Sequence, residues 1–105
     1  MHISATEFEI PCACDVRVDE HSLAVELEDG RGISVPLDWY PRLAHATAEE
    51  RGRWRLIGGG MGIHWEDIDE DISVEGLLLG RPSGESQASF SRWMDGRQTN
   101  RGQQV

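Results

Sequence analysis

The sequence predicts a small α+β domain in which an antiparallel sheet packs against two helices. Segments 14–18, 23–27 and 33–37 each alternate apolar and polar residues, as half-buried strands do. Thr47-Ala48-Glu49-Glu50 has the spacing of a helix capping box. A short apolar segment at 61–65 reads as one more strand. We therefore expect a three-stranded meander, a short extra strand and two helices.

The turn between the second and third segments decides how they pair. A two-residue Asp29-Gly30 loop would put the two apolar rows on opposite faces, which a sheet with one buried side cannot accept. A three-residue loop over 28–30 instead pairs Val25 with Ile33 and places Gly30 at a positive φ. We predict this bulged hairpin. Pro36 has no N–H to donate, so the third strand ends there or lies at an edge.

The helices follow from their caps. The capping box predicts a helix that runs to about Leu56, turns Trp54 inward and stops at the glycines 58–60. Ser73 caps a second short helix, which Gly80 closes.

The chain divides near Gly80 by composition. Residues 1–80 form the predicted α+β domain, and 81–105 form a polar tail with a short helix near 88–95. The tail from Gly96 onward is expected to be disordered.

Charge is distributed unevenly along this chain of net charge −9. Residues 1–80 hold 17 acids and 6 arginines, whereas residues 81–105 hold 2 acids and 4 arginines. An acidic body repels phosphates, which argues against direct nucleic-acid binding. No stretch has the length of a membrane span, and no secretory signal is visible. We expect a cytoplasmic protein.

Cys12 and Cys14 are the only cysteines. With His2 and His21 they could form a zinc site, but one intervening residue does not make a zinc knuckle. Alternation places Cys14 on the same face as Val16, so we expect buried or half-buried free thiols and no metal or other cofactor.

Several motifs fall in the order typical of one protein family. The order is Asp29-Gly30, Val35-Pro36-Leu37, Tyr40-Pro41-Arg42-Leu43, Ala46-Thr47-Ala48-Glu49-Glu50-Arg51, Ile63-His64-Trp65, Asp69-Glu70-Asp71-Ile72-Ser73 and Leu77-Leu78-Leu79-Gly80. The span from Cys14 to Gly80 resembles a bacterial family of small domains of unknown function. Glu66 stands where that family often has proline.

The resemblance implies a compact α+β domain with an antiparallel sheet and two helices. Some members look like the front half of helix-turn-helix proteins. Others look like antitoxin-like partners of a neighbouring small protein. No catalytic residue carries over, because the family has no accepted mechanism.

The acidic run after the 61–65 strand is the first candidate site. It comprises Glu66, Asp67, Asp69, Glu70 and Asp71. Its D-x-D-x-D start is that of a calcium loop, but an EF-hand needs Gly and Glu at later positions that this chain fills with Ile and Leu. A solvated turn before a helix, open to a basic partner, is the interpretation we favour.

Large aromatic residues supply the second candidate. Most should be core, but Trp39 with Tyr40 is the pair expected to be partly exposed, where it could support an interface. Phe90 and Trp93 lie on one face of the predicted tail helix. They could dock on their own domain, on the mate in a homodimer or on another chain.

His64 points away from its apolar neighbours and could act as a general base with Asp67 or Asp69. We favour a hydrogen-bonded histidine that orients the acidic turn. The predicted function is a non-enzymatic interaction domain for a basic protein, with an antitoxin-like role as its most concrete form. An acidic nucleic-acid mimic and a metal-dependent hydrolase stay open as alternatives.

Overall fold

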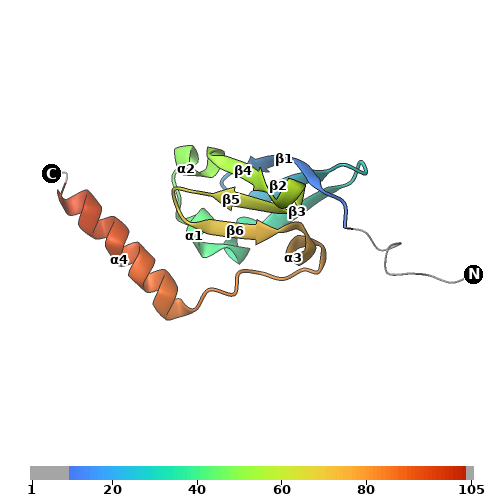
Figure 1. The fold of residues 1–105 in the computed structure, drawn as a ribbon. Coiled ribbons are helices and arrows are strands. Elements are labelled where there is room, and N and C mark those ends of the chain that lie inside the picture. The colour runs from blue at the N-terminus through green and yellow to red at the C-terminus, as the bar shows by residue number, and fades with distance from the viewer. Residues whose placement is uncertain (1–9, 104–105) are drawn as a thin grey trace, which may run out of the picture.

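The computed structural model describes residues 10–103, with side chains up to residue 97, as two three-stranded antiparallel sheets with short helices (Figure 1). The strand orders are β1-β2-β3 and β4-β5-β6, here called sheet A and sheet B. This confirms the α+β class. The elements in chain order are β1 (Ala13–Val18), β2 (Ser22–Leu27), β3 (Gly32–Pro36), η2 (Leu37–Trp39), α1 (Pro41–Ala44), α2 (Ala48–Gly52), β4 (Trp54–Ile57), η3 (Gly58–Gly60), β5 (Gly62–Trp65), β6 (Glu70–Ser73), α3 (Val74–Leu78) and α4 (Gln87–Gln103).

The predicted register of the β2–β3 hairpin is confirmed. Val25 pairs with Ile33, and the Leu27 amide donates to the Arg31 carbonyl at 2.8 Å. Gly30 has a φ of 94°, a region that only glycine adopts without strain. The three-residue loop therefore keeps the apolar rows of both strands on the buried face.

The start of β1 differs from the prediction. The β1–β2 register shifts between Ala13 and Asp15, so Cys14 is the extra residue of an irregularity. Ala13 and Val16 are buried, whereas Cys14 is exposed and Cys12 is half-buried. The expectation of a buried or half-buried Cys14 is wrong because simple alternation does not count an inserted residue.

The helix predicted from Thr47 to Leu56 is shorter than expected. The capping box is present, but α2 ends at Gly52 and Trp54–Ile57 forms β4. Trp54 pairs with Trp65 across β4 and β5 and is half-buried. Cross-strand pairing outweighs the local helical signal here, so the predicted extra strand becomes the centre of a second sheet.

The acidic run ends in a strand rather than entering a helix directly. Residues 66–69 form a turn, and Glu70 and Asp71 begin β6, which pairs with β5. Ser73 caps α3 as predicted, because its hydroxyl accepts a hydrogen bond from the Gly76 amide at 2.9 Å.

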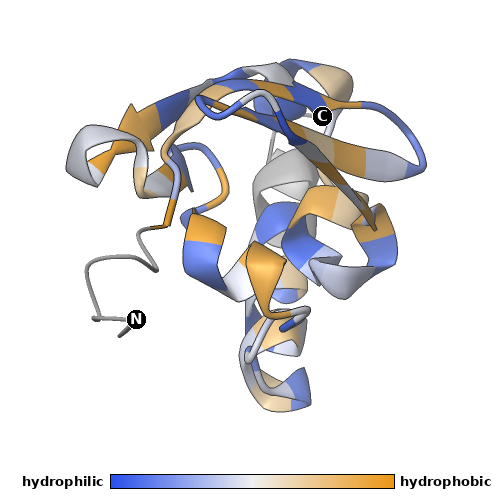
Figure 2. Ribbon diagram, turned by 90° about the vertical axis from the view of Figure 1, so that its right-hand side faces the viewer, coloured by the Kyte–Doolittle hydropathy of each residue, from blue (hydrophilic) through white to orange (hydrophobic). Residues whose placement is uncertain are grey.

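One hydrophobic core joins both sheets and the short helices. Apolar and polar residues alternate along the strands, as Figure 2 shows by colour. The largest fully buried side chains are Trp65, Leu23, Leu43, Ile63, Ile68, Val25 and Val74. The Trp65 indole donates to the Arg51 carbonyl at 3.0 Å, so its polar atom is satisfied inside the core.

The tail helix is longer than predicted. α4 spans Gln87–Gln103 instead of residues 88–95, so helix replaces the disorder expected from Gly96 as far as residue 103. It follows an extended segment, 81–86, that runs under the body (Figure 1). No helix in the described range is long and apolar enough to cross a membrane.

Candidate interaction surface

The β5–β6 turn holds the acidic run in a fixed conformation. Ile68 is fully buried at its centre. Arg42 on α1 donates from Nη1 to the carbonyls of Ile68 at 3.0 Å and Asp69 at 3.4 Å. Asp69 has a φ of 51°, which aspartate tolerates better than most residues. The carboxylates therefore project from a backbone anchored to the core and to α1.

Two of the five carboxylates have partners within the chain. The Asp67 carboxylate pairs with Arg53 at 3.1 Å. Asp71 hydrogen-bonds to Nδ1 of His64, across the β5–β6 pair. The prediction of a hydrogen-bonded His64 is confirmed, but its partner is Asp71 in β6 rather than an acid of the turn.

Two other carboxylates are exposed to solvent. Among the described residues, no hydrogen bond or ion pair engages the side chains of Glu66 and Asp69. The fifth, Glu70, is half-buried, and burial together with repulsion from Glu85 raises its pKa to about 7. The predicted acidic surface is therefore smaller than the sequence indicates.

The local arginines are shared with other carboxylates. Arg53 also approaches Glu49 at 3.7 Å. Arg42 donates from Nε to Glu85 at 2.9 Å, and this pair is largely buried. The guanidinium holds the pKa of Glu85 below its usual range. Arg53 is shared by two acids and Arg42 is taken up by Glu85, so this end of the molecule keeps a negative excess.

A hollow of about 340 Å³ lies between the turn and the start of α4. We call it the acidic hollow, and it is lined by Arg42, Asp69, Glu70, Ser83, Gly84, Glu85 and Ser89. It holds three carboxylates and one guanidinium, and that guanidinium is already occupied by Glu85 and two carbonyls. A cationic side chain would find uncompensated negative charge there.

The aromatic pair before α1 does not form an exposed patch. Tyr40 is 4% exposed, and its hydroxyl donates to the Arg81 carbonyl at 3.3 Å. Burial raises its pKa to about 12. The expectation of a partly exposed Tyr40 is wrong, because its ring fills the core beneath the 81–86 segment. Trp39 is half-buried and packs against the same core.

Phe90 and Trp93 lie where the first turns of α4 meet the body. The rings of Phe90 and His45 make an edge-to-face contact, with 5.2 Å between their centroids. The guanidinium groups of Arg42 and Arg97 both lie over the Trp93 ring, at 5.3 and 4.6 Å from its centroid. Of the alternatives for these aromatics, docking on their own domain is the arrangement observed.

A second, smaller site surrounds the histidine. A hollow of about 240 Å³ is lined by Arg53, Trp54, Arg55, His64, Glu66 and Asp67. The hydrogen bond between Nδ1 and the Asp71 carboxylate fixes the orientation of the His64 ring, as in a general base held by a carboxylate. No serine, threonine or cysteine lines this hollow to serve as a nucleophile. Within the described range, no cluster of three or more metal-ligating side chains is found, and His2 lies outside that range.

The chain matches one family of known sequences. Residues 13–83 match the DUF2442 family, proteins of unknown function, and the chain belongs to that family. No curated protein shows a significant match to it. The match confirms the resemblance to a family of unknown function. The helix-turn-helix and toxin associations stay predictions.

Two solved structures are similar to this one. A crystal structure of a protein of unknown function from Rhodospirillum rubrum aligns with a TM-score of 0.64 and 29% identity, over 76% of this chain and 96% of that one. The solution structure of the uncharacterized protein CV0863 from Chromobacterium violaceum aligns with a TM-score of 0.60 and 26% identity, over 88% of this chain and 79% of that one. The alignment therefore takes in nearly all of the first chain.

Sequence reasoning missed the residues that fasten α4 to the body. Arg42 holds Glu85, and Glu50 holds Arg97 through two bonds of 2.9 Å each. The Glu50 carboxylate also belongs to the capping box, which gave a local explanation for it. Partners more than forty residues apart leave no signal in the spacing of a single sequence.

Proposed function

We propose that this chain is a non-enzymatic protein-interaction domain that binds a basic partner protein at the acidic hollow. The observation that carries this is the composition of the hollow, where Asp69, Glu70 and Glu85 face one guanidinium that is already engaged. Such a site favours an arginine or lysine side chain over a neutral or acidic one.

The position of Glu66 suits it to guide the partner rather than to hold it. It is exposed in the same turn as Asp69 and lines the neighbouring hollow with Trp54. Exposed charge at the rim of an interface raises the association rate and is screened by salt. Half-buried Trp54 offers an aromatic face beside it, in place of the exposed pair expected at Trp39 and Tyr40.

Binding by this route depends on pH. Glu70 has a pKa of about 7, so it is largely protonated at pH 6 and largely ionised at pH 8. A cation in the hollow favours the ionised form, and by linkage the affinity rises over this interval. Neutralisation of a small basic neighbour is the form of this function that the family resemblance suggests.

The test compares two charge-neutralised variants of equal net charge. In the first, Glu66→Gln is combined with Asp69→Asn, and asparagine tolerates the positive φ at that position. The control combines Glu28→Gln with Glu75→Gln, two exposed acids on the β2–β3 turn and α3 that do not line the acidic hollow.

The full chain is used to capture partners from its own host, and the captured protein is purified for calorimetric titration. We expect a basic protein, with affinity about tenfold weaker for the first variant at low salt and a loss that shrinks at roughly 0.5 M salt. We expect the control variant to bind the partner with the same affinity as the wild type. An acidic partner, or equal affinity for wild type and the first variant, would refute the proposal. Competition by DNA for the same partner would favour the mimic alternative.

A further inference from the structure

Among the four edge strands that the structure describes, β3 is the one without charge. β1 contains Asp15 and Arg17, β4 contains Arg55, and β6 contains Glu70 and Asp71. β3 reads Gly-Ile-Ser-Val-Pro. Natural sheets normally protect exposed edges with charge, bulges or coverage. Within β3 only Pro36, at the far end, has this effect, and α3 contacts the strand without a hydrogen bond to its backbone.

The other edge of sheet A is protected in two of these ways. β1 carries the register shift near Ala13, and it contacts α2 and β4. The η3 turn lies against its beginning so closely that a Cβ at Gly60 would come within 2.8 Å of the Cβ of Cys12. The β2–β3 pairing, in contrast, is regular from Ser22–Pro36 to Glu26–Gly32.

The free backbone groups of β3 can be identified from its pairing with β2. The Leu27 amide bonds to Arg31 and the Leu37 amide bonds to His21, so alternate residues of β3 face β2. Gly32 and Ser34 therefore direct their N–H and C=O groups away from the sheet. Both residues are exposed, and no hydrogen bond to their backbone groups from another described residue is found on that side.

We infer that the β3 edge is a dimer interface, at which two copies of this chain pair β3 with β3 in antiparallel orientation. In the register that pairs Gly32 with Ser34 of the second copy, all outward backbone groups of both residues find partners. Ile33, half-buried on the inner face, then meets Ile33 of the other copy. Pro36 falls at the end of the ladder, where its missing N–H is not needed.

Charge limits where on the surface two copies of this chain can meet. Two chains of net charge −9 repel one another over most of their surfaces. In this register no charged residue of β3 faces another, and Arg31 lies opposite Val35. Arg31 is already paired with Asp29 at 2.7 Å, so exposed Glu28 is the remaining charge of the flanking turn. The edge is therefore where two acidic molecules can meet at least cost.

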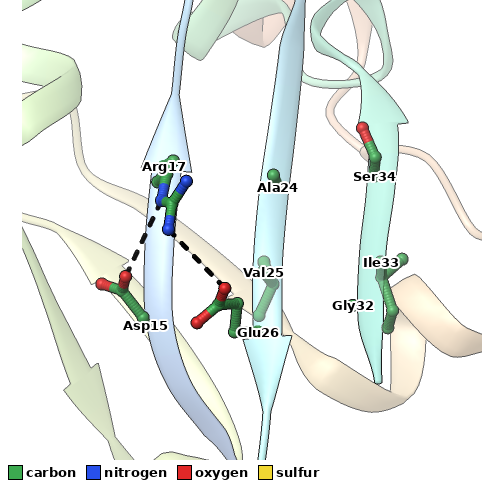
Figure 3. A pocket seen from close by; sticks show the side chains of 8 residues that line it. All are labelled: Asp15, Arg17, Ala24, Val25, Glu26, Gly32, Ile33 and Ser34. Atoms are coloured by element: carbon green, nitrogen blue, oxygen red, sulfur yellow. Dashed lines mark ion pairs between the residues drawn. The ribbon is translucent and has the colours of Figure 1, made fainter. Parts of the chain in front are cut away.

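Small side chains line the outer face of sheet A next to β3. Figure 3 shows β3 outermost, with Ala24, Gly32 and Ser34 lining a shallow hollow of about 230 Å³. These side chains are small and do not overhang the edge. The charged residues of this face, Arg17 with Asp15 and Glu26, lie on the side of β1 and pair with one another. The pairing would extend sheet A into one continuous sheet of both copies.

The experiment measures the mass of the full chain by sedimentation over a dilution series. We expect twice the 11.8 kDa of one chain at high concentration. Ser34→Pro removes an outward N–H that β2 does not use, and Ser34→Lys places a cation beside the edge. Each should weaken dimerisation at least tenfold. Ala24→Lys adds the same charge one strand further in and serves as the control, with circular dichroism to confirm that each variant folds.

Amide hydrogen exchange gives a second readout that does not depend on a variant. In the dimer, the amides of Gly32 and Ser34 should become protected as concentration rises, while other exposed amides do not change. A wild-type chain that stays monomeric up to about 1 mM would overturn the proposal, as would a dimer unaffected by both Ser34 variants. Protection of these amides only on adding another protein would assign the edge to an extended segment of that protein instead.

Discussion

Glu50 and Glu70 are the same residue type in two half-buried positions, and their pKa values lie far apart. Hydrogen bonds from Arg97 and from the Thr47 backbone lower the pKa of Glu50 to about 2. Burial and repulsion from Glu85 raise the pKa of Glu70 to about 7. One carboxylate fastens α4 to α2, and the other lines the acidic hollow. The negative charge of Glu50 therefore stabilises the fold, whereas the negative charge of Glu70 destabilises it.

This contrast separates structural acids from candidate binding residues. A basic partner gains little by approaching an acid that is already paired with a buried arginine of its own chain. Where acids are crowded around a cation that is fully used, an incoming positive group relieves repulsion that folding has left in place. The location of unrelieved charge is therefore a better guide to an interaction site than the number of acids in a run.

Removing Arg42 should have the largest effect, because this residue pairs with Glu85 at the acidic hollow and also lies over Trp93 of α4. Arg42→Met keeps the aliphatic stem near Trp93 but leaves Glu85, which is 12% exposed as a side chain, without its cation. It also frees the carbonyls of Ile68 and Asp69. We expect a loss of about 3 kcal/mol in the free energy of unfolding, measured by urea titration.

Arg53→Met is the matched comparison. Its guanidinium pairs with Glu49 and Asp67, and all three side chains are largely or partly exposed. Exposed pairs contribute at most about 1 kcal/mol, so this variant should lie well above Arg42→Met in stability. Equal losses for the two arginines would show that burial of the Arg42–Glu85 pair has no special importance.

Glu50→Gln tests the favourable side of the comparison. Glutamine keeps the capping-box geometry and one hydrogen bond to Arg97 but removes the charge. We expect a loss of about 1.5 kcal/mol at pH 7. Because the folded-state pKa is lowered, the wild-type advantage should be complete above pH 4.5 and disappear as the pH falls towards 2. Urea titrations at pH 7 and pH 3 measure this.

Its neighbour Glu49 provides the control. Glu49 has a side chain that is 83% exposed and lies 3.7 Å from Arg53. Glu49→Gln should change stability by less than about 0.5 kcal/mol at either pH. A Glu50 effect that persists unchanged at pH 3 would contradict the assignment of its role to charge.

The parts of the fold that the sequence predicted are those decided by short-range rules. The β2–β3 register follows from side-chain alternation and from the geometry at Gly30. The caps at Thr47 and Ser73 follow from hydroxyls three residues before their bonded amides. β4 was missed because Trp54–Ile57 forms a strand only through its pairing with β5, which no local pattern encodes.

The candidate site, too, could be predicted only where it depends on residues that are neighbours in the sequence. Crowding of Glu66, Asp69 and Glu70 is visible in the sequence because these residues are neighbours. Glu85 enters the acidic hollow from the start of the tail, and Arg42 enters from α1. Their meeting depends on how α4 docks. Single-sequence reasoning can therefore find charged segments but not which of their charges the fold compensates.

Glu70→Gln tests the unfavourable side and should give the smallest effect. The folded-state pKa of Glu70 is raised, so the folded protein binds more protons than the unfolded chain between about pH 4.5 and 7. Wild-type stability should fall through that interval as Glu70 is forced to ionise. Replacing it by glutamine should therefore raise stability at pH 8 by about 1 kcal/mol, a figure reduced for partial solvent exposure.

At pH 5 the same substitution should have almost no effect, because wild-type Glu70 is then protonated and resembles glutamine in charge. Thermal unfolding of both proteins at pH 5 and pH 8 measures the difference, and Glu66→Gln, exposed in the same turn, is the control for a general loss of negative charge. If Glu66→Gln stabilises the protein as much as Glu70→Gln at pH 8, the effect belongs to net charge. If Glu70→Gln alone does so, unrelieved repulsion is concentrated in the acidic hollow, where a basic partner would relieve it.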